Sequence, residues 1–194
     1  MPLRALARYL APLALAIAVT GCGHMPLTSM VKLARVDLET SDPAQLRAAI
    51  KMPRTLRPRP NGMVLRIAVR VGNAPEESRD FLLRELSDPA ELASEASASS
   101  HIFAYRIDDA DIPRLIALRT ELIAKKNSGR GGSITIGVQP QACQMGELPQ
   151  GPIYFTTYLR TAETGDYVTL ARDVDLRALA QARSLVDVIP RCAP

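Results

Sequence analysis

Short runs of alternating apolar and polar residues, separated by turn-forming residues, constrain the fold of this sequence most. The clearest run extends from Met63 to Val71, where Leu65, Ile67 and Val69 share one face. Successive side chains of a strand point to opposite faces, so this spacing predicts a half-buried strand. Similar runs occur at residues 31–38, 81–86, 101–107, 134–138, 153–160 and 167–172. Together they predict a mainly β, α+β fold, built on an antiparallel β-sheet or sandwich.

Residues 45–52 fit two structures. Asp42 could cap a helix with Pro43 in its first turn, yet the apolar residues Leu46, Ala48, Ile50 and Met52 also lie at a spacing of two. Pro53 ends the run at a length that is marginal for a helix. The strand is therefore favoured, with the helix as the alternative. The following segment, residues 53–62, contains three prolines and should be extended or turning.

One amphipathic helix is expected over residues 112–126. Its apolar stripe includes Leu115, Leu118 and Leu122, while Lys125 and Lys126 suit the negative end of the helix dipole. A second, C-terminal helix could span residues 176–185. The chain is therefore expected to combine many strands with few helices.

The N-terminal residues have the three zones of a secretory signal peptide. Arg4 and Arg8 precede an apolar stretch from Leu10 to Val19, and small residues follow it. The apolar stretch is about half as long as a bilayer-spanning helix, which requires about 20 residues. Export with removal of residues 1–21 is therefore expected, rather than a permanent transmembrane helix.

The end of this leader, Val19-Thr20-Gly21-Cys22, resembles the lipobox of bacterial lipoproteins. The resemblance implies that Cys22 is acylated, becomes the new N-terminus and holds the protein to a membrane. Gly23, in place of an aspartate, implies the outer membrane facing the periplasm by the sorting rule of enteric lipoproteins. Residues 22–30 would then be a tether, and residues 31–194 a single globular domain.

Cys143 and Cys192 are the two cysteines that remain once Cys22 carries lipid. An even pair in an oxidising compartment predicts a disulfide. Two unpaired thiols are the alternative. A metal site is less favoured because neither cysteine has a histidine or third cysteine nearby in the sequence, so no metal is expected.

Composition argues against nucleic acid as a partner. Without Arg4 and Arg8, 22 basic residues face 20 acidic ones, and aromatic residues make up 4% of the chain with no Trp. Nucleic-acid binding usually relies on excess positive charge and often on stacking side chains.

The sequence contains no familiar catalytic motif, and no cofactor is expected. His101 is interpreted as a surface or edge residue, and Asp108, Asp109 and Asp111 as residues that cap the helix after them. The glycine-rich residues 128–133 follow a helix, which favours a turn over a phosphate site.

The densest basic stretch contains Arg54, Arg57 and Arg59. It could contact anionic lipid head groups or lipopolysaccharide phosphates, and a solvated loop is the alternative.

These features favour a non-enzymatic binding or assembly module of the cell envelope, anchored by its N-terminal lipid and serving an envelope protein partner. Two alternatives remain open: an envelope hydrolase or transferase, and a periplasmic carrier of lipid or another apolar ligand.

Overall fold

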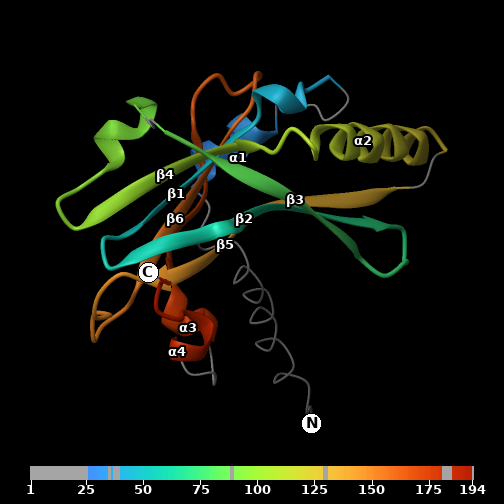
Figure 1. The fold of residues 1–194 in the computed structure, drawn as a ribbon. Helices are drawn as coiled ribbons and strands as arrows, with labels where there is room; N and C mark the ends of the chain where they lie inside the picture. The colour runs from blue at the N-terminus through green and yellow to red at the C-terminus, as the bar shows by residue number, and fades with distance from the viewer. Residues whose placement is uncertain are drawn as a thin grey trace, which may run out of the picture.

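The structure, a computed structural model, describes residues 26–34, 36, 40–87, 90–128, 131–180 and 185–193. Its centre is an antiparallel seven-stranded sheet in the order β5-β2-β3-β4-β1-β6-β7 (Figure 1). The strands are β1 (Arg47–Pro53), β2 (Leu56–Val71), β3 (Glu77–Leu86), β4 (Ser100–Ile107), β5 (Gly132–Gln144), β6 (Tyr154–Arg160) and β7 (Val168–Asp175). The predicted mainly β, α+β class with an antiparallel sheet is therefore confirmed.

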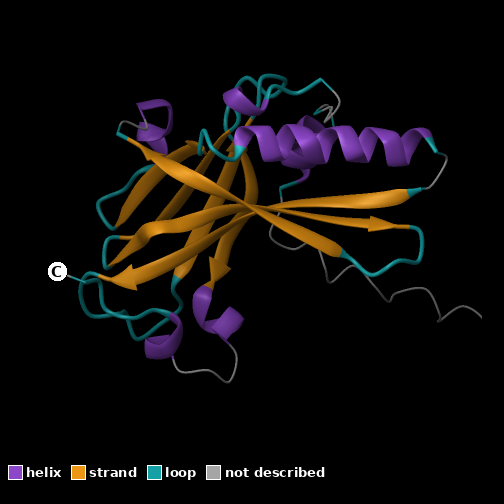
Figure 2. Ribbon diagram, turned by 45° about the vertical axis from the view of Figure 1, so that its right-hand side comes forward, coloured by secondary structure: helices purple, strands orange, loops and turns teal. Residues whose placement is uncertain are grey.

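The sheet curves back on itself because β3 changes partner along its length. Residues 77–82 of β3 pair with β2, while Leu83–Leu86 pair with β4. A tight turn at Arg54 and Thr55 joins β1 to β2, although these two strands pair with different neighbours. The two halves of the sheet face each other across one apolar interior, which gives the molecule a nearly barrel-like shape (Figure 2).

The strand interpretation of residues 45–52 is correct for most of the segment. β1 begins at Arg47 and pairs with both β4 and β6, so it lies in the middle of its half of the sheet. The cap suggested by Asp42 is also present, because its carboxylate accepts a hydrogen bond of 2.9 Å from the Ala44 N–H. It caps the short 3₁₀ helix η1 (Pro43–Gln45) instead of an α-helix.

The proline-rich segment is both turning and extended: the turn at Arg54 and Thr55 follows Pro53, and residues 56–62 form the first part of β2. Asn61 and Gly62 lie within β2, in the stretch where the register of β2 against β5 shifts between Pro58 and Met63. Prolines cannot donate to a ladder, and they are tolerated here because β2 pairs on only one side until it meets β3 at Val64. A Cβ on Gly62 would lie 2.9 Å from the Gln141 carbonyl oxygen, so only glycine allows this close approach.

Two helices differ in how well the sequence predicted them. The expected amphipathic helix is α2 (Ile112–Asn127), and it packs Leu115 and Leu118 into the core. The strand expected over residues 31–38 is wrong for residues 31–33, which belong to α1 (Leu27–Leu33), and residues 35, 37 and 38 of that run lie outside the described residues. The short run of mixed residues in α1 fits either period, and packing of Leu33 against the core selects the helix.

The short helices lie at the periphery of the sheet. The 3₁₀ helix η2 (Ala90–Glu95) covers the outer face through Leu92. The C-terminal helix expected over residues 176–185 is present for its first part as α3 (Leu176–Ala180); residues 181–184 lie outside the described residues, and a further helix is α4 (Leu185–Val188). Among the described residues, no helix has both the length and the apolar character that crossing a bilayer requires.

Acidic residues organise the corner between β4 and α2. Asp111 is the N-cap residue, but its carboxylate accepts from the Leu82 N–H and pairs with Arg114 instead of capping the helix. Asp108 is buried and accepts from the Ala110 N–H at 3.0 Å and from Arg84. The capping interpretation of these aspartates is therefore replaced by a role in joining strand, turn and helix.

This corner predicts a loss of stability in acid. The Ala110 N–H, followed by Arg84, holds the pKa of Asp108 below its ordinary 3.8. Because the folded state binds this proton less readily, the resulting stabilisation is complete above the ordinary pKa and disappears as the pH falls through the folded value. We expect Asp108→Asn to lower the urea midpoint at pH 7 and to lose less stability than the unmodified protein below pH 3.8.

Urea titrations across this pH range measure the effect, with the exposed Asp166→Asn as the matched control. Parallel pH profiles for the unmodified protein and Asp108→Asn would contradict the assignment.

Candidate ligand cavity

A cavity of about 240 Å³, partly open to solvent, lies at the end of the apolar interior beside α3 and α4. Ile50 and Met52 of β1 and Phe155 of β6 form one wall, and the C-terminal residues contribute Leu176, Val188 and Ile189. The opposite side is formed by Arg59 of β2 and by residues 140–142 of β5. The cavity therefore lies between strands from both halves of the sheet.

A smaller apolar space of about 50 Å³ lies under α2 at the other end of the interior. Leu65, Leu118 and Leu122 contribute to its lining, and Arg119 donates a hydrogen bond of 2.8 Å to the Ser41 carbonyl oxygen beside it. This volume holds little more than one water, whose share of liquid volume is about 30 Å³. The cavity near α3 and α4 is the better candidate for a ligand.

Arg59 reaches the cavity because β2 is irregular at this point. The residue lies between Pro58 and Pro60, within the stretch where the register against β5 shifts, and Asn61 has a positive φ of 54°. Residues 59–62 of β2 lie opposite only Gln141 of β5, and extra residues in one strand turn the side chains around them away from the regular alternation. Arg59 consequently lines the cavity while remaining exposed to solvent.

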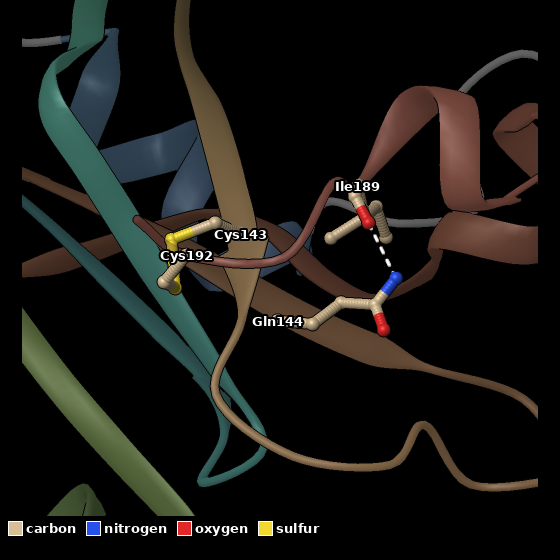
Figure 3. The surroundings of a disulfide bond; sticks show 4 residues. All are labelled: Cys143, Gln144, Ile189 and Cys192. Atoms are coloured by element: carbon tan, nitrogen blue, oxygen red, sulfur yellow. Dashed lines mark hydrogen bonds between the residues drawn. A yellow bond between two sulfur atoms is a disulfide. The ribbon is translucent and has the colours of Figure 1, made fainter. Parts of the chain in front are cut away.

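The C-terminal wall of the cavity is held by the end of β5. Gln144 donates its backbone N–H to the Pro190 carbonyl oxygen at 2.8 Å and accepts from the Cys192 N–H at 3.0 Å. Its side-chain amide also donates to the Ile189 carbonyl oxygen, as Figure 3 shows. Three hydrogen bonds thus attach residues 189–192 to the sheet.

A disulfide joins the same two segments. Cys143 and Cys192 are bonded, with their Cα atoms 4.8 Å apart, and Figure 3 shows the bridge beside the Gln144 contact. The pair predicted from the cysteine count is therefore present. It links the edge of the cavity formed by β5 to the segment that carries Ile189.

Asp175 positions the start of α3 beside the cavity. Its carboxylate accepts from the Ile153 N–H at 3.0 Å and from the Arg177 N–H at 2.9 Å. These backbone donors, Ile153 first, hold the pKa of Asp175 below its ordinary value. The ionised carboxylate thereby fixes the corner from which Leu176 enters the lining.

The three arginines of the basic stretch have different surroundings. Arg54 is tied down, because its guanidinium donates to the Ala98 carbonyl oxygen at 2.8 Å and contacts His101 Nε2 at 2.8 Å. Arg57 and Arg59 lie exposed on β2, and of the three only Arg59 lines the cavity. Contact of Arg54, Arg57 and Arg59 with an anionic surface stays a prediction.

The remaining residues singled out in the sequence lie elsewhere. Cys22 lies outside the described residues, as do residues 129 and 130 of the glycine-rich segment. His101 is an exposed residue of β4. No group of three or more His, Cys, Asp or Glu side chains suited to a metal ion occurs within the described ranges.

Sequence reasoning did not find the cavity itself. Its lining comes from β1, β2, β5, β6 and the C-terminal helices, which are far apart along the chain. The one local feature of the sequence that points to the cavity is Arg59, which lies between Pro58 and Pro60. Comparison of the chain with protein-family models, with curated proteins and with solved structures finds no match in any of the three.

Proposed function

We propose that this chain is a lipid-anchored binding module of the bacterial cell envelope that acts without catalysing a reaction. The observation that carries the proposal is the leader ending in Val19-Thr20-Gly21-Cys22, which resembles a lipobox. The Cys143–Cys192 disulfide supports an oxidising compartment such as the periplasm. The cavity of about 240 Å³ supports binding of a ligand in the body of the protein.

The short length of chain between Cys22 and α1 limits how the folded domain would be oriented at the membrane. α1 begins at Leu27, only five residues after Cys22. Five residues span at most about 18 Å, so a lipid on Cys22 would keep α1 close to the membrane surface. Met30 and Val31 of α1 are 44% and 60% exposed and are suited to contact with the lipid interface.

This arrangement would present the cavity to the periplasm. In Figures 1 and 2 α1 lies beside the upper part of the sheet, whereas α3 and α4 lie at the bottom. A protein held through residues next to α1 would turn its lower end, and with it the cavity, away from the membrane. The outer membrane facing the periplasm is the location that the residue after Cys22 favours.

Lipid attachment is tested by replacing the acceptor thiol. Cells expressing the full chain are grown with an alkyne-labelled palmitate, and the protein is captured and analysed for label, size and membrane association. We expect label on the unmodified protein and none on Cys22→Ser, which should also stay larger because its leader is not removed. Each acyl chain contributes about 0.8 kcal/mol per buried methylene, so loss of the lipid should change fractionation.

The matched control is the double variant Cys143→Ser/Cys192→Ser, which removes the other two thiols and should keep its label. Absence of label from the unmodified protein, or retention of label by Cys22→Ser, would refute lipid anchoring. Turnover of an envelope ester or glycan by the purified protein would favour the hydrolase or transferase alternative.

A further inference from the structure

We infer that the cavity beside α3 and α4 binds a small monoanionic amphiphile, with its acidic group at Arg59 and its apolar tail against β1 and β6. The inference rests on the proposed function, because it gives the binding module its class of ligand. Three properties of the cavity support it: its walls, its charge and its size.

The inner walls are suited to an apolar chain. Ile50 and Met52 are 0% and 1% exposed, Ile189 is 2% exposed and Phe155 is 8% exposed. The part of this apolar lining that faces solvent is Val188, which is 41% exposed, with the partly exposed Leu176 and the edge of Phe155, and an acyl chain that covers it would lose contact with water. Burial of apolar surface supplies about 25 cal/mol per Å² to such binding.

The charge at the cavity is positive. Among the described residues that line it, Arg59 alone is charged, and no acidic side chain is present there. Within the part of the chain that the structure describes, the Arg59 guanidinium has no hydrogen bond or ion pair with another side chain. It can therefore form the bidentate, charge-assisted contact that arginine makes with a carboxylate or phosphate.

Gln141 adds a polar group at the same side of the cavity. It belongs to β5, and its backbone carbonyl oxygen is the atom that β2 approaches at Gly62. An amide can donate a hydrogen bond to an anionic oxygen. A cation and a neutral polar residue on one side of the cavity, with apolar side chains on the other, match a ligand that is acidic at one end and apolar along the rest.

The size of the cavity limits the ligand. A volume of about 240 Å³ lies just below the roughly 300 Å³ at which pockets for drug-sized molecules begin. It is therefore too small for a two-chain phospholipid and suits a medium-length fatty acid or the chain end of a larger single-chain lipid. The expected ligand is a single acyl chain with one anionic group.

The inference is tested by photolabelling the full chain, purified from membranes and placed in nanodiscs of zwitterionic lipid. The probe is decanoate carrying a diazirine on its tail and an alkyne, and the light-dependent label is mapped by mass spectrometry. We expect label on peptides that contain Met52 or Phe155, and competition by unlabelled decanoate but not by decylamine. Only label that depends on light is counted, so the lipid attached to Cys22 does not contribute to the signal.

Two charge reversals on one strand provide the matched comparison. Arg59→Glu should lower the cavity label roughly tenfold, the effect of about 1.4 kcal/mol lost at one charge-assisted contact. Arg57→Glu makes the same charge change two residues away on β2, at an exposed position outside the lining, and should retain the label. Thermal unfolding of both variants shows whether each has folded.

A third variant separates the cavity from surface charge. Ala142→Leu adds volume to the lining and should reduce the label while Arg59 is unchanged. Absence of light-dependent label at the cavity, equal competition by decylamine, or equal loss in Arg59→Glu and Arg57→Glu would overturn the inference. If photolabelling fails while palmitate still labels Cys22, the proposed ligand class is wrong and the lipid anchor stands. If photolabelling succeeds while palmitate does not label Cys22, the lipid anchor is wrong and the ligand class stands.

Discussion

Replacement of Cys143 and Cys192 by serine should lower the free energy of unfolding by about 4 kcal/mol. The two cysteines are 49 residues apart, and a cross-link over this separation reduces the entropy of the unfolded chain by about that amount in the chain-entropy model. Domains of ordinary stability unfold with about 5–15 kcal/mol, so the double variant loses a large part of its stability. Urea titration followed by circular dichroism measures the difference.

Hydrogen exchange near the C-terminus should show the loss of the disulfide as well as the free energy of unfolding does. Without the bridge, residues 189–192 are held mainly by their hydrogen bonds to Gln144. We expect the amide protons of Gln144 and Cys192 to exchange faster in the double variant than in the unmodified protein, while β1 in the middle of its half of the sheet stays protected.

The control is the unmodified protein treated with dithiothreitol, which breaks the same bond without changing a residue. It should unfold at nearly the same urea concentration as the double variant. A double variant as stable as the oxidised protein would show that the bridge contributes little, and that the hydrogen bonds at Gln144 suffice to hold the C-terminus.

Truncation of Phe81 to alanine should cost about 3–5 kcal/mol of stability, the range found for removal of a buried aromatic ring. Phe81 is 1% exposed and lies opposite Leu65 in the ladder between β3 and β2. The Arg114 guanidinium of α2 lies 5.4 Å from its ring centroid. The ring therefore joins the two strands to α2, and its loss leaves a cavity where all three meet.

Tyr154→Ala provides the comparison, because it removes an aromatic ring from the start of β6 at a position that is 51% exposed. We expect it to change the unfolding free energy by less than about 0.5 kcal/mol, as surface substitutions usually do. Equal effects of the two substitutions would contradict the position of Phe81 in the shared core.

Local pattern predicted most of the secondary structure because strand and helix periods are visible in short windows. β4 and β6 lie almost where the alternation predicted them, and α2 extends the expected helix by one residue. The prediction failed where two periods fit the same residues, as in α1, and it left open whether the proline-rich start of β2 is extended or turning. In both cases the packing of neighbouring elements decided, and packing is not visible in a short window.

The sequence by itself determined the mainly β class, the main helix and the pairing of the two cysteines of the body. Each of these three features depends on the types of residue and their positions along the chain, and these are the same in the unfolded and in the folded protein. The tertiary structure alone decided which strands became neighbours, that β3 joins the two halves of one curved sheet, and that a cavity remains beside the C-terminus. These features arise from contacts between segments far apart in the chain, where many pairings satisfy the same local pattern and only the packed interior selects one.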